Sequence, residues 1–264
     1  MHPFDQAIAL EPLGDGIVRG HTSERYWNFV GPYGGVTAAV LLNAMLSSPE
    51  RLGDPLTLTV NFAAPIHAGA FTVAARPLRS TRTTQHWAAQ LTQGNDPQPL
   101  ASAVSVFAVR RSTWNLTEAI PPDIAGLEDS EQYLPFPKLR WPAMYDMRYV
   151  RGRVLAENAD SLTYSWIRDA PPRALDYASL TSICDAFFPR IFLRRLHLVP
   201  IGTVSLNVYF HVDAPTLAQQ GLEAVLAVAR ANVFIQGYFD QEGEVWGRDQ
   251  RLLATTHQVV WYKE

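Results

Sequence analysis

The stretch Thr57–Asn61 reads TLTVN, and it recurs 146 residues later (203 − 57) at Thr203–Asn207 as TVSLN, with hydroxyl, aliphatic and amide residues in the same order. A second stretch, Leu100–Val106, is matched by Leu253–Val259 at an offset of 153 residues (253 − 100). Two matches at nearly equal offsets indicate an internal duplication. The 264 residues therefore predict two similar units of about 130 residues each, close to the usual size of a domain.

The boundary between the units follows from composition. Residues 112–142 are rich in proline and acidic residues. The prolines include Pro121, Pro122, Pro135 and Pro137. Such a segment is typical of an ordered linker rather than of a third domain. We therefore expect an N-terminal unit over residues 1–111 and a C-terminal unit over residues 143–264.

Each unit shows the same order of elements, in which a strand is followed by a helix and then by a run of strands. We expect one helix over Val36–Ser47, entered through Gly34 and Gly35, and a second within Tyr177–Leu196. Strands are expected at Leu56–Ala64, Ala70–Arg79, Thr84–Thr92, Ala101–Arg111, Met147–Ala156, Leu162–Arg168, Thr203–Val212, Ala224–Ile235, Val233–Asp240 and Leu252–Tyr262. The pattern predicts an α+β fold with two long helices, each wrapped by a curved antiparallel sheet, and with the two sheets joined.

Composition excludes several classes of protein. Apolar residues make up 47% of the chain and charged residues 18%, as in ordinary globular proteins. The net charge of −3 gives no overall field to attract nucleic acid. We find no window apolar enough to span a bilayer and no signal peptide, so cytoplasmic residence is the simplest interpretation. A single cysteine, Cys184, excludes an internal disulfide and a multi-cysteine zinc site.

Three segments of the second half carry a resemblance to a known family. They are Thr181–Asp185, Thr203 with the later Tyr209-Phe210-His211, and Ala254–Gln258. With the order of elements, these segments resemble the acyl-CoA thioesterases with a tandem, or double, hotdog fold, which are related to bacterial thioesterase II. The resemblance implies that Asp185, Thr203 and Gln258 together hold the water that attacks an acyl-CoA thioester.

The chemistry of thioester hydrolysis agrees with these three residues. The reaction needs a positioned water, a group that takes its proton, and donors for the oxygen that becomes negative. Asp185 can accept the proton, while Thr203 and Gln258 can orient the water through a hydroxyl and an amide. Backbone N–H groups at a helix start can polarise the carbonyl. No metal or bound cofactor is needed.

Further residues are expected to bind the substrate. The candidates for the apolar crevice and its entrance are Tyr33, Gly34, Gly35, Phe187, Phe188 and Tyr209. Arg190 belongs to a basic group with Arg194 and Arg195. Such a group is more often a solvated helix face, and the alternative is a contact with the phosphates of coenzyme A.

Several alternatives remain open from the sequence. Cys184 beside Asp185 suggests a nucleophilic thiol, but no histidine lies near it in the sequence. Strand alternation predicts that His257 faces away from Gln258. A non-catalytic acyl-CoA-binding protein is one rival function. An enoyl-CoA hydratase-like enzyme, which would pair Asp185 with His211, is another.

The first unit lacks the polar set of the second. Alignment of the two halves places Thr57 opposite Thr203 and Ser105 opposite Gln258, so the first copy keeps a hydroxyl and has lost the rest. We therefore expect one site, in the second unit. Exposed sheet edges also favour a homodimer or a larger homo-oligomer.

Overall fold

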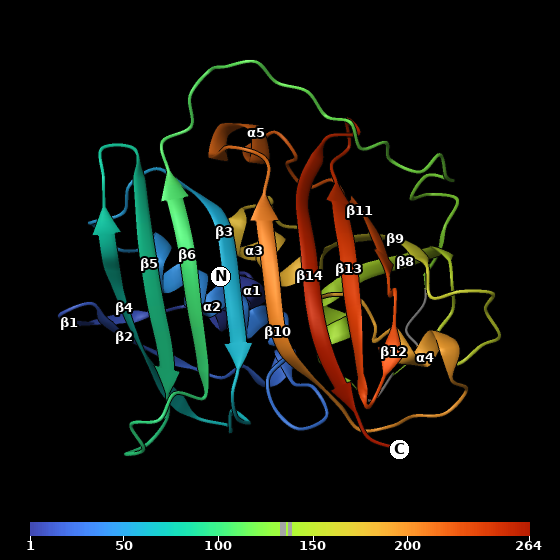
Figure 1. Ribbon diagram of the computed structural model, residues 1–264, viewed down its shortest axis with the longest axis horizontal. Helices are drawn as coiled ribbons and strands as arrows, with labels where there is room; N and C mark the ends of the chain where they lie inside the picture. Colours follow the sequence, from blue (N-terminus) through green and yellow to red (C-terminus); the bar gives the residue numbers. More distant parts are fainter. Residues whose placement is uncertain (133–135, 137–138) are drawn as a thin grey trace.

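The computed structural model of the protein describes residues 1–132, 136 and 139–264. Within these residues the strands form one antiparallel sheet of 14 strands. Figure 1 shows the first-half strands, coloured blue to green, beside the orange and red strands of the second half, with α2 (Gly34–Leu46) and α3 (Tyr177–Ile183) behind the sheet. The two predicted sheets are therefore joined, and the combined sheet is open.

The two halves contribute their strands in mirrored order. From the centre outward, the first half supplies β3 (Asp54–Phe62), β6 (Ala101–Ala108), β5 (Thr84–Thr92), β4 (Ala70–Ser80), β2 (Ile17–His21) and β1 (Glu11–Gly14). The second half supplies β10 (Ile201–Phe210), β14 (Leu252–Tyr262), β13 (Tyr238–Trp246), β11 (Val225–Arg230), β9 (Thr163–Asp169), β8 (Tyr145–Arg151) and β7 (Glu131–Gln132), while β12 (Phe234–Ile235) pairs with β13. The remaining elements are α1 (Pro3–Ala7), α4 (Ile191–Arg194), α5 (Ala214–Ala218) and the 3-10 turns η1 (Glu24–Tyr26) and η2 (Trp141–Met144).

The repeated stretches meet at the centre of the sheet. Strands β3 and β10 are antiparallel neighbours, and Val60 lies opposite Leu206. These two residues are separated by the same 146 positions as the repeat (206 − 60), so equivalent residues of the two halves face each other. Both are completely buried. The axis that relates the halves therefore passes close to this pair.

Helix α2 forms the centre of the core. Ten of its 13 residues are buried, and the sequence GGVTAAVLLNAML is apolar on nearly every side. A helix of this kind must be enclosed, because a surface helix keeps one polar face. The sheet covers one side of α2 and α3 packs on another. Among the described residues, no helix is long and apolar enough to cross a membrane.

The second helix differs from its expected length. Helix α3 has seven residues and ends at Ile183, so the prediction of two long helices is wrong for this half. Its start is capped by Asp176, which accepts a hydrogen bond from the Ser179 amide at 2.8 Å. Tight turns follow it, and Pro189 disfavours helical backbone at the preceding residue. As a result, Asp185 lies in a loop beyond the helix.

The segment that joins the halves crosses the end of the sheet (Figure 1). The backbone carbonyl of Ala125 accepts a hydrogen bond from the Trp166 indole at 3.0 Å. Strand β7 and turn η2 both begin inside the expected linker, which is therefore partly structured. Pro135 and Pro137 lie outside the described residues, and the unit boundaries at residues 111 and 142 stay predictions.

Candidate active site

The start of helix α2 holds the carboxylate of Asp185. The residue before the helix, Tyr33, provides no side-chain cap, so the first backbone N–H groups of the helix are open to another acceptor. A Cβ atom at Gly34 would lie 2.8 Å from Oδ2 of Asp185. The carboxylate can approach this closely only because position 34 is a glycine. The expected catalytic acid of the second half thus lies at the start of the first-half helix.

The neighbouring residues fix this junction between the halves. The Tyr33 hydroxyl donates to the Ser182 carbonyl at 2.6 Å, and its ring stacks on Trp141 with centroids 4.3 Å apart. A Cβ atom at Gly35 would lie 2.5 Å from the same carbonyl oxygen. Both glycines that the sequence singled out are therefore required by close approach of α3 and its following loop.

Burial changes the acidity of Asp185. The residue is 8% exposed, and removal from water raises the pKa of its carboxyl to about 7. Hydrogen bonds from the Gln258 side chain and the Gly35 backbone N–H act in the opposite direction, because they stabilise the carboxylate. A carboxyl group with a pKa near 7 is well suited to accept a proton at neutral pH.

A β-bulge places Thr203 on the same face of the sheet as the candidate site. In the pairing of β10 with β14, Thr203 lies opposite Val260 and Ser205 opposite Val259, so Val204 is the extra residue. Side chains alternate between the two faces of a strand, and the buried Leu206 marks the inner face of β10. Without the bulge, this alternation would place Thr203 on the opposite, outer face. The extra residue reverses the alternation and brings Thr203 onto the inner face.

Gln258 lies on the same inner face of β14. It is 2% exposed, and its Nε2 is 3.5 Å from the carbonyl oxygen of Cys184, the residue before Asp185. The adjacent His257 is exposed on the other face, with Nε2 3.6 Å from Oδ2 of Asp240. The prediction that His257 faces away from Gln258 is therefore confirmed.

Strand register corrects one equivalence drawn from the sequence. Leu206 lies opposite Gln258, whereas its counterpart Val60 lies opposite Ala103. The first-half equivalent of Gln258 is therefore Ala103 and not Ser105. The sequence alignment was displaced by two positions because it had no information on which residues are paired across the strands.

Asp185, Thr203 and Gln258 line one cavity of about 60 Å³. By the same measure a water molecule needs about 10–15 Å³, so a few waters or a small group fit. Tyr33, Gly34, Phe187 and Phe188 line it as well. Residues that the sequence did not single out complete the wall: Asn28, Phe29, Phe136, Leu139, Trp141, Pro189, Phe192, Ile201, Gln241 and Val260. Most of these are aromatic or aliphatic, so the cavity presents a few polar atoms in an apolar surface.

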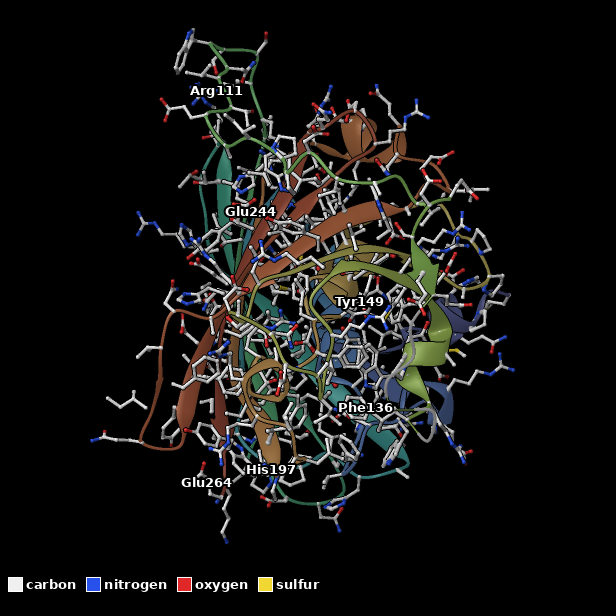
Figure 2. The ribbon with its side chains drawn as sticks, turned by 90° about the vertical axis from the view of Figure 1, so that its right-hand side faces the viewer. Arg111, Phe136, Tyr149, His197, Glu244 and Glu264 are labelled. Carbon is white, nitrogen blue, oxygen red and sulfur yellow. The ribbon has the colours of Figure 1, made fainter. Side chains whose placement is uncertain are left out.

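The linker supplies part of this wall. Phe136, labelled in Figure 2, packs edge to face on Phe188 and on Phe192. Trp141 contacts Phe188 from turn η2. The sequence carried one signal of this contribution: large aromatic residues lie among the prolines of the polar linker, and such residues need an apolar surface to cover them.

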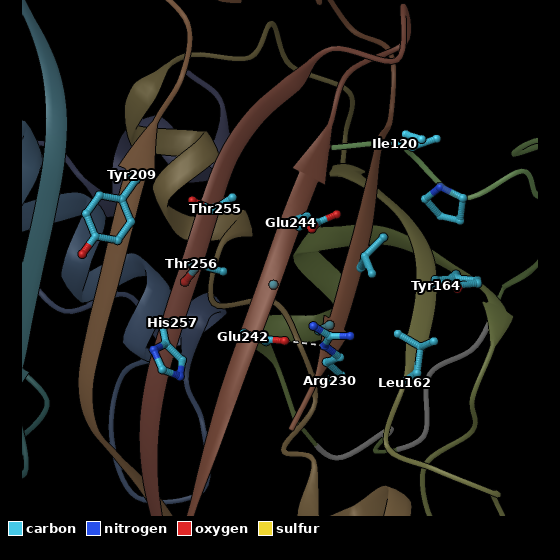
Figure 3. Close-up of a pocket in the computed structure, with 14 residues that line it drawn as sticks. Ile120, Leu162, Tyr164, Tyr209, Arg230, Glu242, Glu244, Thr255, Thr256 and His257 are labelled. Atoms are coloured by element: carbon cyan, nitrogen blue, oxygen red, sulfur yellow. Dashed lines mark hydrogen bonds and ion pairs between the residues drawn. The ribbon is translucent and has the colours of Figure 1, made fainter. Parts of the chain in front are cut away.

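Two expected substrate-binding residues lie elsewhere. Tyr209 is 47% exposed on the outer face of the sheet, where it lines a different cavity of about 540 Å³ (Figure 3). Arg190 is 1% exposed, so its expected place on a solvated basic face is wrong. Arg194 donates to the Asn158 carbonyl and Arg195 forms an ion pair with Glu264. The three arginines therefore do not form one surface group.

The outer cavity is a shallow surface between β11, β13, β14 and the linker (Figure 3). Arg230, which reaches into it, is already paired with Glu242. The linker side is formed by Ile120 and Pro122. None of the three residues expected to handle the water lies here.

The alternative nucleophile and the alternative histidine are poorly placed. Cys184 is completely buried, and burial together with the neighbouring Asp185 raises the pKa of its thiol, which disfavours the reactive thiolate. His211 hydrogen-bonds to the Thr255 hydroxyl at 3.0 Å and does not line the cavity of Asp185. The geometry required for an Asp–His hydratase pair is therefore not met.

Comparison with known proteins places both halves in one family. Residues 23–109 match the family described as the acyl-CoA thioesterase N-terminal domain. Residues 120–262, more than half of the chain, match the acyl-CoA thioesterase C-terminal domain. The chain belongs to the acyl-CoA thioesterase family. The same sequence has no match among curated proteins.

Solved structures agree with the fold of this thioesterase-family chain. A hotdog-fold protein of unknown function from Alicyclobacillus acidocaldarius is 45% identical, with a TM-score of 0.96 and coverage of 100% of this chain and 99% of that chain. An acyl-CoA thioesterase II from Mycobacterium marinum is 15% identical, with a TM-score of 0.78 and 98% of each chain covered. At that identity the second similarity concerns the fold alone.

Proposed function

We propose that this protein hydrolyses acyl-CoA thioesters to the free acid and coenzyme A. The observation that carries the proposal is that Asp185, Thr203 and Gln258, which are distant in the sequence, line one cavity at the start of helix α2. Membership of the acyl-CoA thioesterase family supports the same chemistry.

In this mechanism Asp185 is the general base. Thr203 and Gln258 orient a water molecule, and Asp185 takes its proton as the water oxygen bonds to the thioester carbonyl carbon. The resulting oxyanion collapses, the carbon–sulfur bond breaks, and the departing thiolate receives the proton from Asp185. The pKa of about 7 lets the carboxyl group exchange this proton in both directions near neutral pH.

The aromatic wall would hold the acyl group beside the reacting carbon. Phe187, Phe188 and Phe192 supply an apolar surface next to Asp185. The coenzyme moiety would then remain on the open side of the cavity. Arg190 is excluded as a ligand for its phosphates, because the guanidinium is enclosed by protein groups.

The test is release of free thiol from a panel of acyl-CoAs by the purified protein. We expect hydrolysis by the wild type and its loss in the Asp185→Asn variant, with unchanged binding of a non-hydrolysable acyl-CoA. Binding without hydrolysis in the wild type would favour the non-catalytic acyl-CoA-binding protein instead. Cytoplasmic residence and a homo-oligomeric state stay predictions, the latter to be checked by sedimentation of the purified protein.

A further inference from the structure

A buried arginine lies behind the candidate site, and none of its hydrogen-bond partners among the described residues is acidic. Arg190 donates hydrogen bonds to the carbonyl oxygens of Phe188, Ser161 and Ala229, to the Thr163 hydroxyl and to the side-chain oxygen of Gln241. None of these partners carries a negative charge. Burial lowers the pKa of the Arg190 guanidinium to about 10, so the group remains charged at neutral pH. Burying a charge away from water costs free energy, so the Arg190 guanidinium depends on these hydrogen bonds for its stability in the fold.

Arg190 determines which end of the Gln241 amide faces the cavity. A guanidinium only donates hydrogen bonds, so the Gln241 atom 3.0 Å from its Nε must be the carbonyl oxygen Oε1. The Nε2 group is then the free end of the amide. Gln241 lines the cavity of Asp185, and within the described part of the chain its Nε2 donates no hydrogen bond to another protein group. The cavity therefore contains an oriented amide donor.

Gln241 is adjacent to the residues assigned to the water. It lies directly opposite Gln258 in the pairing of β13 with β14, where side chains on one face are neighbours. Both glutamines are 2% exposed. The two amides therefore stand side by side on the inner face of the sheet, and both glutamines line the cavity.

Hydrolysis of a thioester needs a donor that is not otherwise engaged. Negative charge develops on the carbonyl oxygen during attack and is stabilised by preorganised N–H groups. At the start of α2 the Gly35 N–H already donates to Asp185. We propose that Gln241 Nε2 donates a hydrogen bond to the carbonyl oxygen of the thioester, and that Arg190 is the positioning residue that holds Gln241 in this orientation.

This inference rests on the proposed function, and its first test is the Gln241→Met variant. Methionine has a similar length and removes the donor. We expect kcat for acyl-CoA hydrolysis to fall about 100-fold with KM nearly unchanged, because the lost interaction strengthens only as charge develops. Unchanged kcat in a folded Gln241→Met protein would overturn the inference.

A matched control is Gln220→Met. Gln220 is also a buried glutamine, 4% exposed, but its amide donates to the backbone carbonyls of Glu223 and Ala224 and it does not line the cavity. We expect this variant to lose thermal stability and to keep the wild-type kcat. A purely structural role for Gln241 would produce the same result as the control.

Arg190→Lys tests the positioning role through the same kinetic readout. Lysine retains one charged donor but not the planar group that reaches several acceptors. We expect a fall in kcat in the wild-type background and no further fall in the Gln241→Met background. An equal fall in both backgrounds would show that Arg190 acts independently of Gln241.

The assay separates failure of this inference from failure of the proposed function. Absence of hydrolysis by the wild type would overturn both. Hydrolysis by the wild type, its loss in Asp185→Asn and full kcat in Gln241→Met would leave the proposed function standing and reject the role of Gln241.

Discussion

The two halves differ along one row of residues on the inner face of the sheet. Outward from the centre, the first half presents Val60, Ala103 and Ala89, while the second half presents Leu206, Gln258 and Gln241. All six are buried. Two alanines thus stand where the second half has two glutamines. The same scaffold is packed as plain core on one side and carries polar groups on the other.

The two repeated threonines differ in direction. Thr57 lies opposite the exposed Tyr209 and next to the buried Leu58, so it faces outward. Its counterpart Thr203 faces the cavity because of the bulge at Val204. A similar sequence therefore supplies an outward-facing residue in one half and a residue that lines the candidate site in the other. The difference is one extra residue in a strand.

The largest expected effect separates two buried acids of the second half. Asp185→Asn should lower kcat/KM for acyl-CoA hydrolysis about 1000-fold, because it removes the proton acceptor. Asp169, whose pKa burial raises to about 6, does not line the cavity and serves as the control. Steady-state kinetics of Asp185→Asn and Asp169→Asn measure the two losses. If Asp169→Asn lowered kcat/KM as much as Asp185→Asn, the loss would be due to removal of a buried charge and not to removal of the proton acceptor.

The next effect tests the contribution of the first half. Gly34→Ala should lower kcat about 100-fold, because the new methyl group would displace the Asp185 carboxylate from its place at the helix start. In Gly126→Ala no atom of the described residues lies within 4 Å of the added Cβ, so wild-type rates are expected. Full activity in Gly34→Ala would mean that the helix start of the first half is dispensable.

A smaller effect tests the bulge. Thr203→Val should lower kcat/KM about tenfold, the value of one hydrogen bond of about 1.4 kcal/mol. Thr57→Val at the equivalent repeat position should leave it unchanged, since Thr57 faces away from the cavity. Equal losses in the two variants, measured side by side, would contradict the assignment of the chemistry to one half.

The pH dependence tests which ionisation limits activity. With the Asp185 pKa near 7, kcat/KM should rise with pH and fall about fivefold between pH 7 and pH 6, as the base becomes protonated. The profile is measured with a substrate that is stable over this range. A midpoint near the ordinary aspartate value would show that the base is not buried in the working enzyme.

The smallest effect concerns stability. Because the folded-state pKa of Asp185 is raised, ionisation of this group opposes folding as pH rises from the unfolded value toward 7. Asp185→Asn should therefore raise Tm at pH 8, and the difference should diminish at pH 4 to 5, where the wild-type carboxyl is protonated in the fold. Thermal melts of the wild type and Asp185→Asn at the two pH values measure this Tm difference. A Tm difference independent of pH would contradict the buried charge.

Strand pattern and local composition were sufficient for much of the fold. The final strand, Leu252–Tyr262, and the strand Thr84–Thr92 begin and end where they were predicted, because alternation of apolar residues is a local signal. The second helix was predicted too long, because the turns that end it form against α2. The aromatic wall from Phe136 and Trp141 was also missed, because contacts between distant segments leave no periodic pattern.

The sequence by itself determined the duplication and the order of elements, since both depend on residues that can be compared along the chain, and its resemblance to the thioesterase family nominated Asp185, Thr203 and Gln258 as the candidate set. Only the tertiary structure decided which face Thr203 occupies, that Ala103 and not Ser105 corresponds to Gln258, and that Arg190 is buried behind Gln241. The physical reason is that one bulged residue reverses the side-chain direction of a strand, and that pairing between strands is set by the packed core of the whole molecule.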